Sequence, residues 1–122
     1  MPIVDVELVC RSETEFASLS AEAIANALGG VLGSPPGHTW VRLRQLSSSC
    51  YAENQRVVQQ HELPVFVTLL VARPPVGVTL AEQVAAVTRV VATVTGRSDE
   101  LVHVEYAPAG AGRQAFGGRL VQ

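Results

Sequence analysis

The chain opens with the run Pro2-Ile-Val-Asp-Val-Glu-Leu-Val9, and a similar run, Pro64-Val-Phe-Val-Thr-Leu-Leu-Val71, begins 62 residues later. Both runs are rich in β-branched and apolar residues, and each ends close to an arginine, Arg11 in the first and Arg73 in the second. Such runs are typical of β-strands. Their recurrence at a fixed offset indicates an internal duplication, and this duplication determines the predicted fold.

A helix is expected after the first strand. Ser12 and Glu15 form a capping-box pattern, in which two side chains satisfy free backbone N–H groups at the start of a helix. Apolar residues then recur every three or four positions as far as Leu32, which predicts one amphipathic helix. Gly33 is expected to end this helix, because glycine readily adopts the left-handed conformation of a helix C-terminus.

A second helix is expected in the second copy. Thr79 and Glu82 repeat the capping-box pattern, a stripe of valines follows, and Gly96 marks the exit. Alternating residues at 39–46 and 101–106 predict the strand that closes each copy. Because a strand-helix-strand unit makes a parallel crossover, we expect a four-stranded mixed sheet with both helices on one face.

The predicted fold class is α/β (α+β), a duplicated β-α-β-β-α-β chain. Residues 1–122 are expected to form a single domain of two pseudo-repeats, about 2–60 and 64–122, with a short glycine-rich hairpin at the end. The sheet face opposite the helices is predicted to combine acidic residues of the first strand with the apolar residues Val65, Val67, Leu69 and Val71. Because that face is too apolar to remain in water, we expect a homo-oligomer in which these faces meet.

The amino-acid composition limits the kinds of partner and the cellular location that we expect. The 122 residues carry a formal net charge of -2 and no lysine, and no basic cluster follows a phosphate backbone, which argues against nucleic acid. The acidic N-terminus is unlike a signal peptide, and no apolar stretch approaches about 18 residues, so we expect a cytoplasmic protein without a membrane partner. Cys10 and Cys50 are expected to be free thiols. The three histidines lack metal-ligand spacing, so neither a metal nor a cofactor is expected.

The Met-Pro start, the β-α-β repeat and the arginine after the first strand together resemble the tautomerase superfamily. Arg11 looks like the substrate-binding arginine of 4-oxalocrotonate tautomerase, Arg42 looks like its second-strand arginine, and Ala115-Phe-Gly-Gly118 is similar to its closing hairpin. The length resembles the fused members, such as malonate semialdehyde decarboxylase and cis-3-chloroacrylic acid dehalogenase. This resemblance implies a homotrimer.

The resemblance also implies a catalytic group, the secondary amine of Pro2, which becomes free when Met1 is removed. The small proline at position 2 makes this removal the expected outcome. An amine whose pKa is lowered by burial or neighbouring cations can act as a general base. Pro64 occupies the equivalent place in the second repeat, but its nitrogen is a tertiary amide and cannot accept a proton. Arg73 looks like the arginine that faces the live proline in the decarboxylase.

We therefore expect a tautomerase (isomerase) that moves a proton on a small 2-keto or 2-hydroxy-dienoic acid, with Arg73, Arg42 and Arg11 as candidate ligands of the substrate carboxylate. Dehalogenation, hydration or decarboxylation of a three-carbon acid is the alternative chemistry. Pro75 replaces the second arginine of the decarboxylase pattern, which argues against decarboxylation. A noncatalytic trimeric binding protein is a further alternative.

Some of these residues also have structural interpretations. Arg42 is as well suited to pairing with Asp5 or Glu7 as to binding substrate. Arg11 belongs beside the inactive Pro64, which favours a structural role. His103 occupies the position of the second repeat that matches Arg42, where a hydrogen-bonded interface residue is the favoured interpretation.

Overall fold

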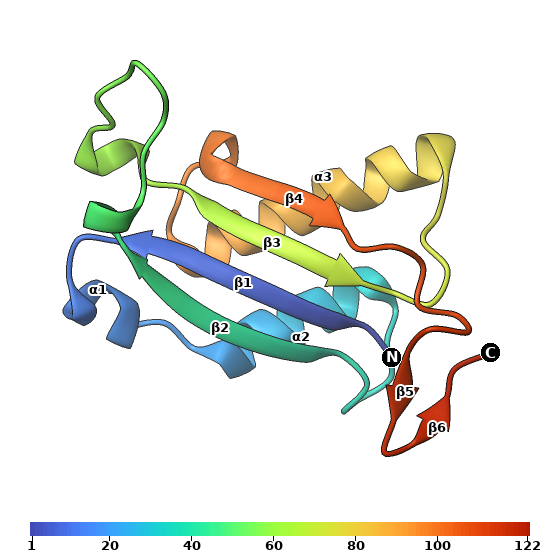
Figure 1. Ribbon diagram of the computed structural model, residues 1–122. Coiled ribbons are helices and arrows are strands. Elements are labelled where there is room, and N and C mark those ends of the chain that lie inside the picture. The colour runs from blue at the N-terminus through green and yellow to red at the C-terminus, as the bar shows by residue number, and fades with distance from the viewer.

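A four-stranded sheet with helices on one face organises the computed structural model, which describes residues 1–122 (Figure 1). The strands are β1 (Ile3–Cys10), β2 (Trp40–Ser47), β3 (Val65–Leu70) and β4 (Val102–Tyr106). Their order is β2-β1-β3-β4; β1 pairs with β2 and β3 with β4 in parallel, whereas β1 and β3 are antiparallel. The predicted duplicated mixed sheet is thereby confirmed.

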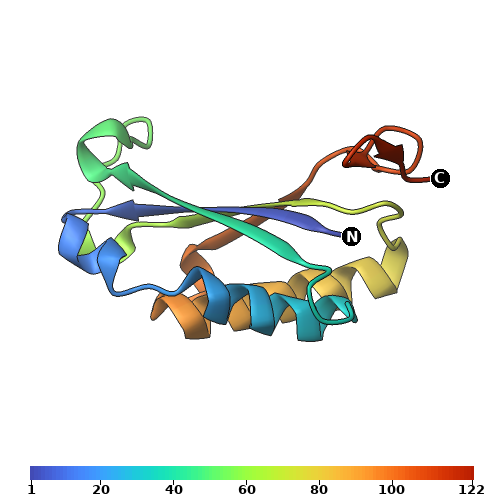
Figure 2. The same cartoon turned by 90° about the horizontal axis from the view of Figure 1, so that it is seen from below.

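Helices α2 (Ala21–Leu32) and α3 (Gly77–Thr95) cover the same face of the sheet (Figure 2). They end at Gly33 and Gly96, which both adopt the left-handed conformation, as predicted. The core between helices and sheet is built from fully buried aliphatic side chains of both repeats. Its main members are Val4, Val6, Leu8, Ile24, Leu28, Val65, Val67, Leu69, Val87 and Val91.

The composition predicted for the open face of the sheet is wrong in part. Val6 pairs with Val67 across β1 and β3, so the valines at 65 and 67 point toward the helices and are fully buried. Apolar side chains occur on both faces of β3, so their alternation alone does not show which face is buried. The register of β3 with β1 determines it. The open face instead carries mainly polar side chains with a few aromatic ones, among them Asp5, Glu7, Trp40, Arg42, Arg44, Phe66, Thr68, His103 and Glu105.

The first predicted helix is interrupted. Helix α1 spans Glu13–Ala17 and is separated from α2 by a short turn. Ser12 caps α1 by accepting a hydrogen bond from the Glu15 N–H at 3.3 Å, and Ser20 caps α2 by accepting one from the Ala23 N–H at 3.0 Å. Serine side chains compete for backbone hydrogen bonds and favour helix starts over helix interiors. The prediction of one continuous helix missed this second cap.

Helix α3 differs from its prediction at its N-terminus. It begins at Gly77, after Val76, and no side chain caps it, so Thr79 lies within the first turn. With 19 residues and a mean hydropathy of 1.2, α3 is long and apolar enough to cross a membrane by length and composition alone. This corrects the expectation that no apolar segment approaches that length. Val87 and Val91 on its inner face are buried in the core.

Two segments rise above the open face at opposite ends of the sheet (Figure 2). One is the connector between β2 and β3, with the 3₁₀ turns η1 (Ser48–Cys50) and η2 (Gln60–Glu62). The other is the predicted C-terminal hairpin, formed by β5 (Ala115–Phe116) and β6 (Arg119–Leu120). A third 3₁₀ turn, η3 (Asp99–Leu101), precedes β4. The open face is therefore a trough whose ends are raised.

Candidate active site

Pro2 lies directly before β1, at the end of the sheet where the C-terminal hairpin rises (Figure 1). Its carbonyl oxygen accepts a hydrogen bond from the Trp40 N–H at 3.0 Å, which extends the pairing of β1 with β2. The Trp40 ring meets the Phe116 ring edge to face, with centroids 5.0 Å apart. The first residues of the chain are therefore held in place by β2 and by the hairpin.

Met1 is held by Gln114, a residue that sequence reasoning missed. The Gln114 Nε2 donates a hydrogen bond to the Met1 carbonyl oxygen at 3.2 Å. Gln114 is 5% exposed and is the one buried residue with a polar side chain. Nothing in the sequence distinguishes this glutamine from the exposed ones, because only the folding of the hairpin onto the N-terminus buries it.

Arg73 shares the Pro2 end of the sheet. It follows β3, which runs antiparallel to β1 and pairs Leu70 with Ile3. The guanidinium group is exposed, and its Nη2 donates to a terminal oxygen of Gln122. This contact is made with a main-chain oxygen rather than with an acidic side chain. Arg73 is therefore a surface cation at the same end of the sheet as the N-terminus.

Arg42 is paired within the chain. Its Nε and Nη2 donate to the two carboxylate oxygens of Asp5, at 2.6 and 2.9 Å. This bidentate contact raises the pKa of Arg42. Arg44 lies 3.9 Å from the same carboxylate, so one acid faces two arginines across neighbouring strands. Of the two interpretations of Arg42, the structure therefore shows the pairing with Asp5.

Arg11 lies at the opposite end of the sheet from Pro2. The length of β1 separates them, about 30 Å for an extended chain of this length. Near Arg11, the Val9 N–H donates to the Pro64 carbonyl at 3.1 Å, and Pro64 is fully buried. The Arg11 Nη1 donates to the Gln60 side chain. The sheet thus places Arg11 with Pro64, and away from Pro2 and Arg73.

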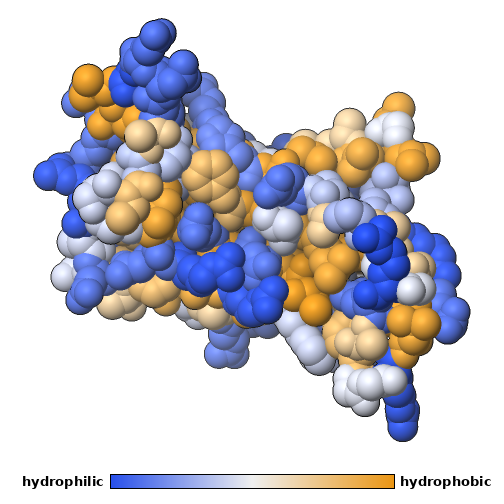
Figure 3. Space-filling view, in the orientation of Figure 1, coloured by the Kyte–Doolittle hydropathy of each residue, from blue (hydrophilic) through white to orange (hydrophobic).

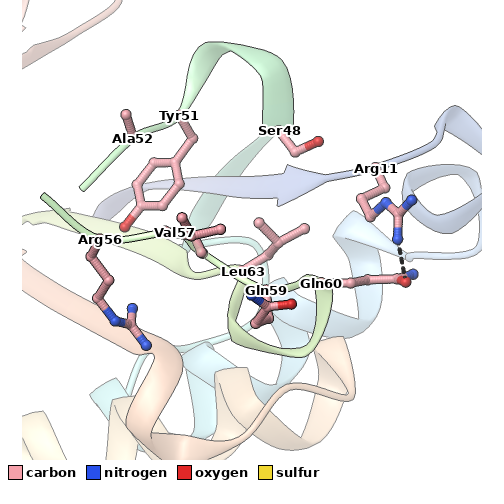
Figure 4. A pocket seen from close by; sticks show the side chains of 10 residues that line it. Arg11, Ser48, Tyr51, Ala52, Arg56, Val57, Gln59, Gln60 and Leu63 are labelled. Atoms are coloured by element: carbon pink, nitrogen blue, oxygen red, sulfur yellow. Dashed lines mark hydrogen bonds between the residues drawn. The ribbon is translucent and has the colours of Figure 1, made fainter. Parts of the chain in front are cut away.

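A cavity of about 390 Å³ opens beside Arg11, under the connector between β2 and β3 (Figure 4). Its walls include Tyr51, Arg56, Gln60 and Leu63. The charge of Arg56 is met by carboxylates, since it donates to the side chains of Glu53 and Glu62. None of the five principal cavities of the chain includes Pro2 or Arg73. Within one chain, these five cavities therefore leave Pro2 and Arg73 outside their walls.

The open face between the two ends is mixed in character. Hydrophilic side chains run across its middle and hydrophobic ones flank them (Figure 3). Thr68 donates a hydrogen bond to Glu105 at 3.1 Å, and the ring centroids of Phe66 and His103 are 5.6 Å apart. His103 therefore lies against an aromatic ring on this face, as a residue of the exposed sheet surface.

Comparison with known proteins identifies relatives by structure alone. The sequence matches no protein-family model and no curated protein sequence. A fused 4-OT described as a symmetric trimer superposes with a TM-score of 0.71 at 14% identity, covering 98% of this chain and 94% of that one. The macrophage migration inhibitory factor of Trichinella spiralis gives 0.70 at 12% identity, covering 97% and 98%. A malonate semialdehyde decarboxylase inhibited by 3-bromopropiolate gives 0.65 at 20% identity, covering 94% and 88%.

These structures superpose on this chain along nearly its whole length. At these identities the likeness is one of fold, and it confirms the fold that the resemblance in sequence implied. The chain has the fold of the tautomerase superfamily, the fold of 4-OT, malonate semialdehyde decarboxylase and macrophage migration inhibitory factor.

Proposed function

We propose that the protein is a cofactor-independent tautomerase of the cytoplasm that acts on a small 2-keto or 2-hydroxy-dienoic acid. The observation that carries this proposal is the position of Pro2. Trp40 fixes the Pro2 carbonyl and Gln114 holds the acyl group on its nitrogen. Removal of Met1 would therefore leave a secondary amine at a defined place at the end of the sheet, where it can exchange protons with a bound substrate.

In this proposal the Pro2 amine takes a proton from the carbon next to the substrate carbonyl and returns it at another position. Arg73 binds the substrate carboxylate, because it lies at the same end of the sheet and its side chain is held by a main-chain oxygen of Gln122 rather than by a carboxylate side chain. Arg42 is a weaker candidate, since a substrate would have to displace Asp5 from it. Arg11 lies too far away to serve the Pro2 amine of its own chain.

We further propose that the active protein is a homotrimer in which the open faces of the sheets meet. Two features support this assembly. None of the five principal cavities of one chain is lined by Pro2 or Arg73, so we expect neighbouring subunits to supply walls of the substrate site. The open face also carries large side chains that a partner could cover, among them Trp40, which is 47% exposed. The fused 4-OT structures of this fold are described as trimers.

Intact mass measured on the purified protein is the first test, because Met1 must be absent from active material. Turnover of phenylenolpyruvate to its keto form should then fall by about 100-fold or more in Pro2→Ala, because the ring-held secondary amine is replaced by a primary amine that is no longer fixed in position. Arg73→Ala should mainly raise KM, by roughly 10- to 100-fold, as expected for a lost charge-assisted hydrogen bond.

Arg89→Ala is the matched control, because Arg89 is an exposed arginine on α3 and its side chain makes no hydrogen bond. Its kinetics should match those of the wild type. Full activity in material that retains Met1, or in Pro2→Ala, would contradict the mechanism. A folded trimer without measurable turnover would instead support the noncatalytic binding protein.

A further inference from the structure

The amide of Gln114 is the buried polar group that the fold alone does not explain. Its Nε2 donates to the Met1 carbonyl, whereas its Oε1 is buried and has no hydrogen-bond partner. A buried polar group without a partner costs about 1–3 kcal/mol, and such groups are uncommon in folded proteins. An apolar side chain of the same size would fill this space without that cost.

The position of the amide is set by packing. The Gln114 carbonyl accepts a hydrogen bond from the Val121 N–H at 2.8 Å, which fixes the backbone at the base of the hairpin. Gly110 is buried against the side chain, and a Cβ built on Gly110 would lie 2.5 Å from the Gln114 Oε1. The absence of a side chain at position 110 therefore gives the amide its space beside the N-terminus.

The Met1 carbonyl shows where the amide points. Its carbon is bonded to the Pro2 nitrogen, so its oxygen stands in for a carbonyl oxygen of a molecule placed against that nitrogen. When Met1 is removed, Gln114 loses this partner, whereas the hydrogen bond from the Val121 N–H and the packing against Gly110 remain. Its N–H donors then face the space next to the free Pro2 amine, where a substrate carbonyl is the natural acceptor.

We propose that Gln114 binds the carbonyl oxygen of the 2-keto acid substrate and stabilises its enolate, an inference that rests on the proposed role of Pro2. The Pro2 amine takes the proton from the carbon beside the carbonyl, and the C–H electron pair forms the new C=C bond. The carbonyl π pair moves onto oxygen, where the Nε2 hydrogen bond strengthens as negative charge develops. Return of the proton from Pro2 to oxygen or carbon completes the tautomerisation.

The test compares Gln114→Met with Gln45→Met in protein shown by mass to lack Met1. Gln114→Met keeps the volume and removes both donors, so kcat/KM for phenylenolpyruvate should fall by about 100-fold. Gln45 is an exposed residue of β2 whose side chain makes no hydrogen bond, and its variant should turn over substrate like the wild type. Gly110→Ala should also lower turnover, because its methyl group would displace the Gln114 amide.

Pro2→Ala separates this inference from the function on which it rests. Loss of turnover in Pro2→Ala with full turnover in Gln114→Met would overturn the role of Gln114 and leave the Pro2 mechanism in place. Full turnover in Pro2→Ala would overturn both.

A measurement on the wild-type protein applies even if Gln114→Met does not fold. The assigned side-chain ¹⁵N–H resonances of Gln114 should shift when pyruvate or phenylpyruvate is added to saturation, whereas those of Gln45 should stay in place. An unchanged Gln114 signal with bound ligand would overturn the proposal.

Discussion

Arg97→Met tests the one arginine that is not exposed. Arg97 follows the C-terminal glycine of α3, and its side chain is 10% exposed. Its Nη1 donates to the Leu63 carbonyl at 2.6 Å, and its Nη2 donates to the Val9 carbonyl at 3.0 Å and to the Glu15 carboxylate. One guanidinium thus ties the end of β1, the start of β3 and α1 to the end of α3.

The expected loss follows from these contacts. Methionine keeps most of the volume of the side chain but removes every donor. It leaves the carbonyls of Val9 and Leu63 unpaired in a buried place, at about 1–3 kcal/mol each. The Glu15 side chain is 40% exposed, so its ion pair adds at most about 1 kcal/mol. We expect the free energy of unfolding to fall by roughly 4 kcal/mol, a large share of the 5–15 kcal/mol typical of a domain.

Urea denaturation followed by circular dichroism measures this loss. With a slope of about 2 kcal/mol per M, the midpoint should fall by about 2 M. Protein concentration must be held constant, because assembly would add to the apparent stability. Arg89→Met is the matched control on the exposed side of α3 and should change stability by less than about 0.5 kcal/mol. An Arg97→Met midpoint within error of the control would refute the reasoning.

Two further predictions concern the connector and the interrupted helix. Burial raises the pKa of Tyr51 to about 12, and the hydrogen bond to Glu53 is the second cause. An absorbance titration of the wild type at 295 nm should therefore contain a phenol that ionises near pH 12. This step should be missing from Tyr51→Phe. Because the folded-state pKa lies above the usual value of about 10, the contribution of Tyr51 to stability is complete below pH 10 and is lost as pH rises toward 12; a flat stability profile over that range would contradict it. Ser20→Ala should lower the free energy of unfolding by about 1 kcal/mol through loss of the α2 cap. Ser34→Ala, at a half-buried serine after the helix whose side chain makes no hydrogen bond, should have no effect on the urea midpoint.

Much of the fold was readable from local pattern. The strands, the two glycine-terminated helices and the C-terminal hairpin lie within a few residues of their predicted places, because alternation, helical periodicity and glycine at helix ends are local properties. The helix predictions were wrong at two places, the interruption of the first helix and the start of the second, and both have local reasons. Ser20 competes with the helical backbone in the middle of an apolar stripe, and α3 begins before the Thr79 pattern without any side-chain cap.

Less of the candidate site than of the fold could be predicted from the sequence. The resemblance to the decarboxylase implied that Arg73 faces Pro2, and the antiparallel pairing of β1 with β3 puts the two residues at the same end of the sheet. The pairing of Arg42 with Asp5 was one of two open interpretations, since it depends on the register between β1 and β2. Gln114 was missed because its burial depends on the hairpin meeting the N-terminus, a contact between residues 113 positions apart.

The sequence by itself determined the duplicated β-α-β plan, the apolar stripes of the helices and the proline that a free N-terminus would expose. Each of these is encoded in neighbouring residues whose spacing matches the geometry of a strand or a helix. Only the tertiary structure decided which face of β3 is buried, which carboxylate holds Arg42, and which side-chain amide holds the Met1 carbonyl. Those contacts join distant segments, and strand register and hairpin docking, rather than local propensity, bring their partners within hydrogen-bonding distance.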